Sequence, residues 1–118
     1  MDIDDLGYIG EEIKIGGKIR HIRYAVVGLK ILAKKYGSVV DAFEKMQTMN
    51  LRFDEKTMDD LTALLHAGLA HEDESLTPSD VERMLDIGNM KTAFNKILKS
   101  FTLSTPDAEE GSEATAGE

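Results

Sequence analysis

Hydrophobic residues in this sequence repeat with two different periods. Between Ile13 and Tyr24 apolar and polar residues tend to alternate, and Gly16-Gly17 interrupts the run where a tight turn between two strands would lie. From Ala25 onward the apolar residues recur every three or four positions, which is the spacing of one face of a helix. The pattern therefore predicts an N-terminal β-hairpin followed by helices.

Five helical segments are expected after the hairpin, because start and stop signals separate the apolar stripes. Gly37 suits the end of the first segment, and Ser38 and Asp54 suit the N-caps of the second and third. Gly88-Asn89 separates the fourth segment from the last. The five stripes are Ala25, Leu29, Leu32, Ala33 and Tyr36; Val39, Val40, Phe43 and Met46; Met58, Leu61, Leu64, Leu65 and Leu69; Val81, Met84 and Leu85; and Met90, Phe94, Ile97, Leu98 and Phe101. We therefore predict a mainly α fold, with about five short helices packed as a small bundle beside the N-terminal β-hairpin.

The segment from Asp54 to Asp86 gives the strongest prediction, a pair of helices joined by an acidic turn. Thr77 suits an N-cap, Pro78 suits the first helical position, and Asp80 is placed to complete a capping box. The helix before the turn also carries small residues, which let another helix approach closely on that side: Ala63, Ala67, Gly68 and Ala70.

Length and composition indicate one domain with a modest core, since 42% of the 118 residues are hydrophobic. We expect a flexible lead-in over residues 1–10, a helical domain over 11–104 and a disordered acidic tail over 105–118, which has no Leu, Ile, Val, Phe or Met to bury. The absence of cysteine excludes disulfides and Cys-based zinc sites. No signal peptide and no apolar run near the ~20 residues of a membrane span are present, so the sequence predicts a cytoplasmic protein.

The formal net charge of -8 argues against a general nucleic-acid-binding protein, whose affinity depends on neutralising phosphates. The charge is unevenly distributed, because residues 11–36 contain seven Lys and Arg residues against two Glu residues, whereas residues after 104 contain only acidic ones. One interpretation is a solvated basic face with a solubilising tail. The other is that the basic region docks an acidic partner, or that the tail folds back over it.

Motifs for catalysis or metal binding are lacking. His66 and His71 are five residues apart and share no helical face, and His21 has no partner at a metal-ligand spacing. His71 is expected to stabilise a helix C-terminus or to cap a carbonyl. Glu72-Asp73-Glu74 lacks the spacing of a calcium loop and is interpreted as a surface turn. We therefore expect no enzyme, no cofactor and no metal, and we assign no catalytic, cofactor-binding or metal-binding residue.

Five methionines fall on or near the apolar stripes: Met46, Met49, Met58, Met84 and Met90. The first interpretation is that they fill the core. The second is that some of them line an adaptable groove for a partner helix, because the methionine side chain is flexible and polarisable.

Two segments carry a resemblance to a known family. Residues 64–81 read LLHAGLAHEDESLTPSDV, with a small-residue helix end, a His-Glu-Asp turn and a Thr-capped helix. Residues 17–24, GKIRHIRY, lie upstream and read as the second strand of the hairpin. Both segments resemble tail assembly chaperones of long-tailed bacteriophages, prophages and gene transfer agents. The resemblance extends over about residues 12–100, and the acidic lead-in over residues 1–12 departs from it.

The resemblance implies a non-enzymatic chaperone in the cytoplasm of a bacterial host. Such proteins bind the tape measure protein and keep it soluble until tail tube subunits polymerise around it. The tape measure protein is thus the expected partner, with tail tube subunits and self-association as further expectations. No family motif fixes the contacting residues, so we hypothesise that the hairpin edge and nearby helical grooves bind the partner.

Two other functions stay open. The chain can be an acidic regulatory domain that inhibits a nucleic-acid-binding protein by presenting DNA-like charge, which requires a continuous acidic face on the folded body. It can also be a minor connector subunit of the virion, which requires a stable ring in isolation.

Overall fold

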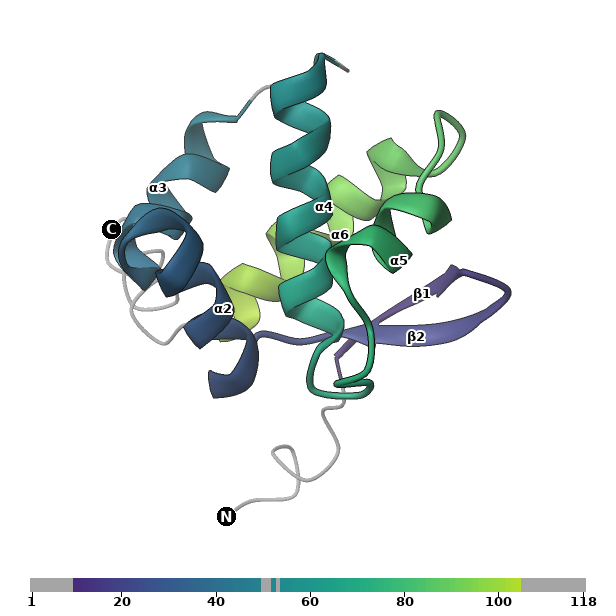
Figure 1. Cartoon of the computed structure of the whole chain (residues 1–118), viewed down its shortest axis with the longest axis horizontal. Coiled ribbons are helices and arrows are strands. Elements are labelled where there is room, and N and C mark those ends of the chain that lie inside the picture. The colour runs from purple at the N-terminus through teal and green to yellow at the C-terminus, as the bar shows by residue number, and fades with distance from the viewer. Residues whose placement is uncertain (1–9, 50–51, 53, 105–118) are drawn as a thin grey trace, which may run out of the picture.

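The computed structural model describes residues 10–49, 52 and 54–104, and within them it confirms five helices and an N-terminal hairpin (Figure 1). The predicted lead-in, apart from Gly10, and the predicted tail over residues 105–118 lie outside the described residues. None of the helices in the described part is long and apolar enough to cross a membrane. The elements are β1 (Glu11–Ile15), β2 (Lys18–Ile22), α2 (Val26–Tyr36), α3 (Val39–Thr48), α4 (Glu55–Leu69), α5 (Pro78–Met84) and α6 (Met90–Ser104).

The hairpin pairs β1 and β2 in antiparallel register around the two predicted turn glycines. Gly16 and Gly17 have φ values of 66° and 83°, which residues with a Cβ rarely adopt. The register places Ile13 opposite Arg20 and Glu12 opposite His21. Because successive side chains point to opposite faces, one face of the hairpin joins the core and the other faces outward.

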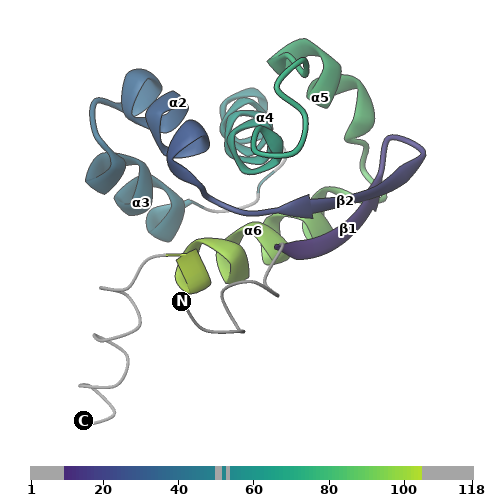
Figure 2. The same ribbon diagram turned by 90° about the horizontal axis from the view of Figure 1, so that it is seen from below.

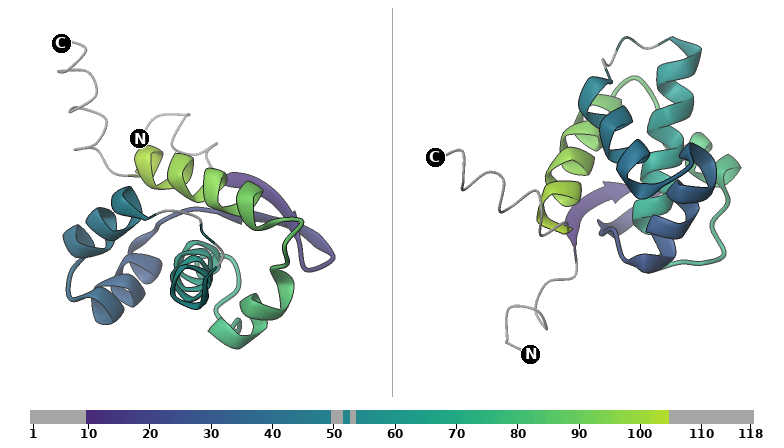
Figure 3. Two further views of the ribbon diagram at one scale, coloured as in Figure 1. Left: turned by 90° about the horizontal axis from the view of Figure 1, so that it is seen from above. Right: turned by 90° about the vertical axis from the view of Figure 1, so that its left-hand side faces the viewer.

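Helix α4 is the centre of the molecule. It packs against α2 on one side and α5 on the other, and it also contacts α6 and β2. Seen along α4 in Figure 2, the α2–α3 pair and α5 flank it, while the hairpin and α6 form a second layer. The two views of Figure 3 show the same arrangement from above and from the side of α2 and α3.

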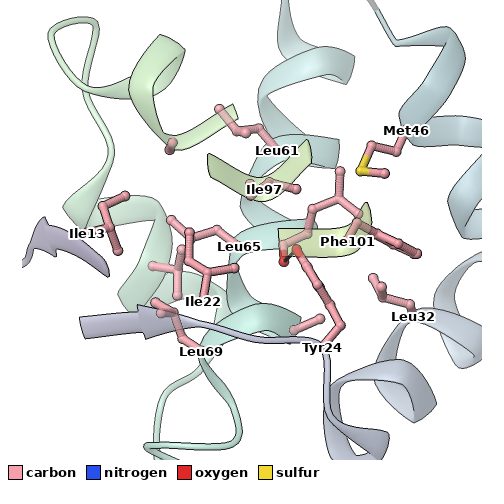
Figure 4. Packing of buried hydrophobic residues seen from close by; sticks show 14 of the residues in the cluster. Ile13, Ile22, Tyr24, Leu32, Met46, Leu61, Leu65, Leu69, Ile97 and Phe101 are labelled. Carbon is pink, nitrogen blue, oxygen red and sulfur yellow. Dashed lines mark hydrogen bonds between the residues drawn. The ribbon is translucent and has the colours of Figure 1, made fainter. Parts of the chain in front are cut away.

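The core lies where these two layers meet (Figure 4). Phe101 of α6 packs against Tyr24 and Phe43, with ring centroids 4.9 and 5.2 Å apart. The Tyr24 hydroxyl donates a hydrogen bond to the Leu64 carbonyl oxygen at 2.6 Å, so the residue that follows the hairpin is tied to the central helix. Each structural element except α5 contributes a residue labelled in Figure 4: Ile13, Ile22, Tyr24, Leu32, Met46, Leu61, Leu65, Leu69, Ile97 and Phe101.

The predicted helix caps are present. Ser38 accepts a hydrogen bond from the Asp41 N–H, Asp54 accepts one from the Thr57 N–H, and Thr77 and Asp80 form a complete capping box. Gly37 ends α2 with a φ of 104°. These local side-chain signals set the helix boundaries as the sequence predicted.

The fourth helix is shorter than predicted. Its predicted apolar stripe ran to Leu85. Helix α5 ends at Met84, and Leu85 is already in an extended conformation. The side chain of Asp86 accepts hydrogen bonds from the N–H groups of Gly88 and Asn89, and the Asn89 amide donates to the Met84 carbonyl. These local side-chain bonds satisfy the end of α5 and start α6, in place of further helical bonds.

Neighbouring elements can pack closely against α4 because of a glycine in α2 as well as the small residues of α4. A Cβ built on Gly28 would lie 2.1 Å from the Ala67 carbonyl oxygen, so only glycine fits at this crossing. A Cβ on Gly68 would lie 2.7 Å from the Ile22 side chain, which places a strand, not a helix, against that position. The predicted close approach is therefore made by α2 at Ala67 and by the hairpin at Gly68.

We predict that Gly28→Ala destabilises the protein. Overpacking typically costs roughly 1–3 kcal/mol, whereas replacing a helical glycine by alanine gains only about 1 kcal/mol. Because the clash is with a backbone atom of Ala67, which cannot rotate away, its cost should lie in the upper half of that range and leave a net loss of about 1–2 kcal/mol, measured by urea unfolding. The control is Val27→Ala at the adjacent exposed position, where a change within about 0.5 kcal/mol is expected. Equal stability of the wild type and Gly28→Ala would contradict the close helix crossing.

Candidate binding surfaces

The outer edge of β2, one of the edges considered for partner binding, is paired within the chain at its C-terminal end. The His21 N–H donates to the Glu72 Oε1 at 2.8 Å, and the His71 Nε2 donates to the His21 carbonyl oxygen at 2.7 Å. Two residues further on, the Arg23 N–H donates to the Gly68 carbonyl oxygen at 2.9 Å. The end of α4 and the following turn thus occupy the place of a neighbouring strand.

The acidic turn is therefore more than the surface turn that the sequence predicted. Besides its bond to the His21 backbone, Glu72 lies 2.6 Å from the His21 ring Nδ1, and Asp73 lies 3.6 Å from the Arg20 guanidinium. Partial desolvation raises the pKa of Glu72, but the bonds from the His21 N–H and ring outweigh it and lower the pKa below its ordinary value. His71 caps a carbonyl, as one of its two predicted roles requires, but this carbonyl belongs to β2.

The outer edge of β1 is less occupied. Because the backbone groups of His21 point away from the hairpin, those of its partner Glu12 point away on the opposite side, and Lys14 follows the same alternation. Neither residue has a hydrogen bond to another element among the described residues. Beside this edge, a hollow of about 430 Å³ is lined from the hairpin and α6 by Glu12, Ile13, Lys14, Ile19, Asn89, Thr92 and Lys96.

A second surface lies between α4 and the connection from α5 to α6. This hollow of about 470 Å³ is lined by four apolar side chains and four carboxylates, and we call it the methionine groove. The elements that line it, the N-terminal half of α4 and the connection from α5 to α6, can be followed in Figure 1. We use the word floor for the apolar lining residues, Met58, Leu85, Ile87 and Met90, and the word rim for the acidic ones, Glu55, Asp59, Glu82 and Asp86; Thr62 also lines the groove.

The methionines contribute to the core and to the lining of the groove, and their binding of a partner helix stays a prediction. Met46 and Met90 are buried, and Met49 and Met84 pack against the core. Met58 is 38% exposed and, together with Met90, lines the groove, and Ile87 beside them is 79% exposed. Sequence reasoning missed Ile87, although an isoleucine beside the Gly88-Asn89 break and off every apolar stripe was a signal for an exposed apolar side chain.

The carboxylates on the groove rim differ in their partners. Asp59 lies 3.6 Å from the Lys35 ammonium group, and Asp86 caps backbone N–H groups at the start of α6. Glu55 and Glu82 make no ion pair within the described part of the chain. Two negative charges on opposite walls are therefore left available to a partner.

Elsewhere, buried polar groups serve the fold. Asp60 of α4 is 5% exposed, and it accepts a hydrogen bond from the Tyr36 hydroxyl at 2.7 Å and lies 3.8 Å from the Lys45 ammonium group. Burial and this bond to Asp60 raise the pKa of Tyr36. The His66 Nε2 donates to the Leu76 carbonyl oxygen at 3.0 Å. No group of three or more metal-ligating side chains occurs among the described residues.

We predict that the Glu72 contact makes stability depend on pH. Because the folded-state pKa of Glu72 is lowered, its contribution is complete above the ordinary value of 4.5 and is lost as pH falls through the folded value. Glu72→Gln keeps an oxygen for the His21 N–H but removes the charge, so unfolding free energy near neutral pH should fall by about 1 kcal/mol.

Urea unfolding of the wild type and Glu72→Gln, compared at about pH 7 and about pH 3, measures this dependence. The difference between the two proteins should be smaller at the acidic pH, because protonation of Glu72 removes its charge as the pH falls through the folded value. Glu74→Gln is the matched control, since this neighbouring carboxylate is exposed and makes no described contact. A difference that persists undiminished at acidic pH, or an equal loss in the control, would contradict a role of the Glu72 charge.

Comparisons with known proteins give no further evidence of identity. No protein-family model, curated protein or solved structure matches this chain.

Proposed function

We propose that this chain is a non-enzymatic tail assembly chaperone, which binds the tape measure protein in the cytoplasm of a bacterial host and keeps it soluble. The resemblance of residues 17–24 and 64–81 suggests this family. The observation that supports binding is the methionine groove, because an apolar floor open to solvent is the kind of surface that receives the hydrophobic face of another chain.

The two segments that carry the resemblance contact each other in the structure. The His-Glu-Asp turn docks on the hairpin, so the two segments of the resemblance form one contact through His21, His71 and Glu72. This contact covers the end of the β2 edge at His21. Within the proposal, the methionine groove is the favoured binding surface, and the β1 edge is the alternative.

The two alternative functions find less support. A nucleic-acid mimic needs a continuous acidic face, but carboxylates of the described body form ion pairs with Arg20, Lys35, Lys45, Arg83 and Lys99. A connector subunit needs a self-complementary assembly surface, and no feature of the described residues favours a ring. The chaperone proposal is therefore retained.

We predict that co-expression with a candidate tape measure protein, a long coiled-coil protein encoded just downstream, makes that candidate soluble. The complex should co-purify on a column, because the exposed apolar floor of the groove would cover apolar segments of the larger chain. An insoluble partner and no complex would overturn the proposed function.

Substitutions tested in the same co-expression assay identify the surface that binds the partner. Ile87→Ser removes the most exposed apolar side chain of the groove and should reduce the soluble partner several-fold, since a buried interface contact of this kind typically contributes over 1 kcal/mol. Val40→Ser is the matched control, because Val40 is 64% exposed on α3, away from the groove. If Ile87→Ser retains full activity while partner binding shifts amide signals of residues 13–36, the β1 edge is the binding surface instead.

A further inference from the structure

The α4 wall of the methionine groove is a continuous helical stripe. Glu55, Met58, Asp59 and Thr62 are spaced at i, i+3, i+4 and i+7, so they lie on one face of α4. With a rise of 1.5 Å per residue, this stripe is about 10 Å long, or two turns of a helix. The length suits an occupant that contacts the wall along two helical turns.

The opposite wall is held by short-range bonds rather than by a flexible loop. Leu85 donates its N–H to the Val81 carbonyl, and Asp86 and Asn89 bond to each other and to neighbouring backbone groups. Ile87 projects from this wall with 79% of its surface exposed. The groove is therefore formed before any partner arrives, which reduces the entropy lost on binding.

The charged residues that line the methionine groove indicate which kind of segment can bind in it. The groove is lined by four carboxylates and by no Lys or Arg, and Glu55 and Glu82 have no ion-pair partner among the described residues. An acidic segment would meet like charge on both walls, which excludes the acidic residues 105–118 as a favourable occupant. A segment with apolar side chains on one face and Lys or Arg at its borders could cover the apolar floor and form ion pairs with the carboxylates of the rim.

We propose that the methionine groove binds an amphipathic helix with basic flanks from a partner protein. Two apolar side chains one turn apart would contact Met58 and Ile87, and basic side chains would reach Glu55 and Glu82. Within the proposed function, this segment belongs to the tape measure protein, and this identification depends on that function. The proposal that the groove binds a basic amphipathic helix does not depend on that function.

The test uses the full chain and two synthetic fluorescein-labelled helical peptides of the same apolar pattern, one with Lys flanks and one with Glu flanks. We expect the Lys peptide to bind at least about tenfold more tightly by fluorescence anisotropy, because the rim charges favour one sign. Its affinity should fall with added salt, as expected for exposed charges.

Three variants separate the floor from the rim. Ile87→Ser should lower the affinity for the Lys peptide, because an apolar contact is lost. The double variant Glu55→Gln with Glu82→Gln should lower this affinity about five-fold and make it depend less on salt. Glu74→Gln, an exposed carboxylate outside the groove, should leave the affinity unchanged. Perturbed amide signals of residues 55–62 and 82–90 should accompany binding.

Equal affinity for the two peptides, or a rim variant that binds like the wild type, would overturn the proposal. A dimer mass in light scattering that Ile87→Ser converts to a monomer would also overturn it, because a second copy would then be the occupant. Peptide binding without solubilisation of the tape measure protein would refute the proposed function alone. Solubilisation that the rim variants leave intact would refute the basic-helix proposal alone.

Discussion

Enclosure of the C-terminal half of α4 is the constraint on which the rest of the structure depends. Leu61, Leu64, Leu65 and Leu69 are fully buried, and Ala67 and Gly68 between them are buried too. A helix that is apolar on nearly all sides is stable only when other elements surround it. The positions of α2, α5, α6 and the hairpin follow from this requirement, since each covers part of the same helix.

The same enclosure explains why the end of the β2 edge is covered while the groove is open. Where α4 ends against β2, its last carbonyl groups and the turn that follows need partners, and the backbone of β2 supplies them at His21 and Arg23. In the N-terminal half of α4, Met58 remains 38% exposed. The C-terminal end of the central helix is therefore bonded to the hairpin, whereas its N-terminal half lines the groove.

Local features were predictable from the sequence, whereas contacts between distant residues were not. The caps at Ser38, Asp54 and Thr77 depend on residues within three positions, so a short window contains the whole signal. The pairing of Glu72 with His21 joins residues 51 positions apart, and no local pattern indicates it. The groove likewise combines residues 55–62 with residues 82–90, and only the packing of α5 against α4 brings these stretches together.

The carboxylate rim has two physical consequences that act together. Exposed apolar groups such as Ile87 promote nonspecific association, and carboxylates around them oppose it because every copy of this chain carries a net charge of -8. The same carboxylates attract a basic segment, whose charges remove the repulsion as its apolar face covers the floor. Discrimination therefore arises from like-charge repulsion as well as from attraction. The proposed chaperone function would need both properties, because the groove must stay accessible before its partner arrives and must not be filled by acidic chains.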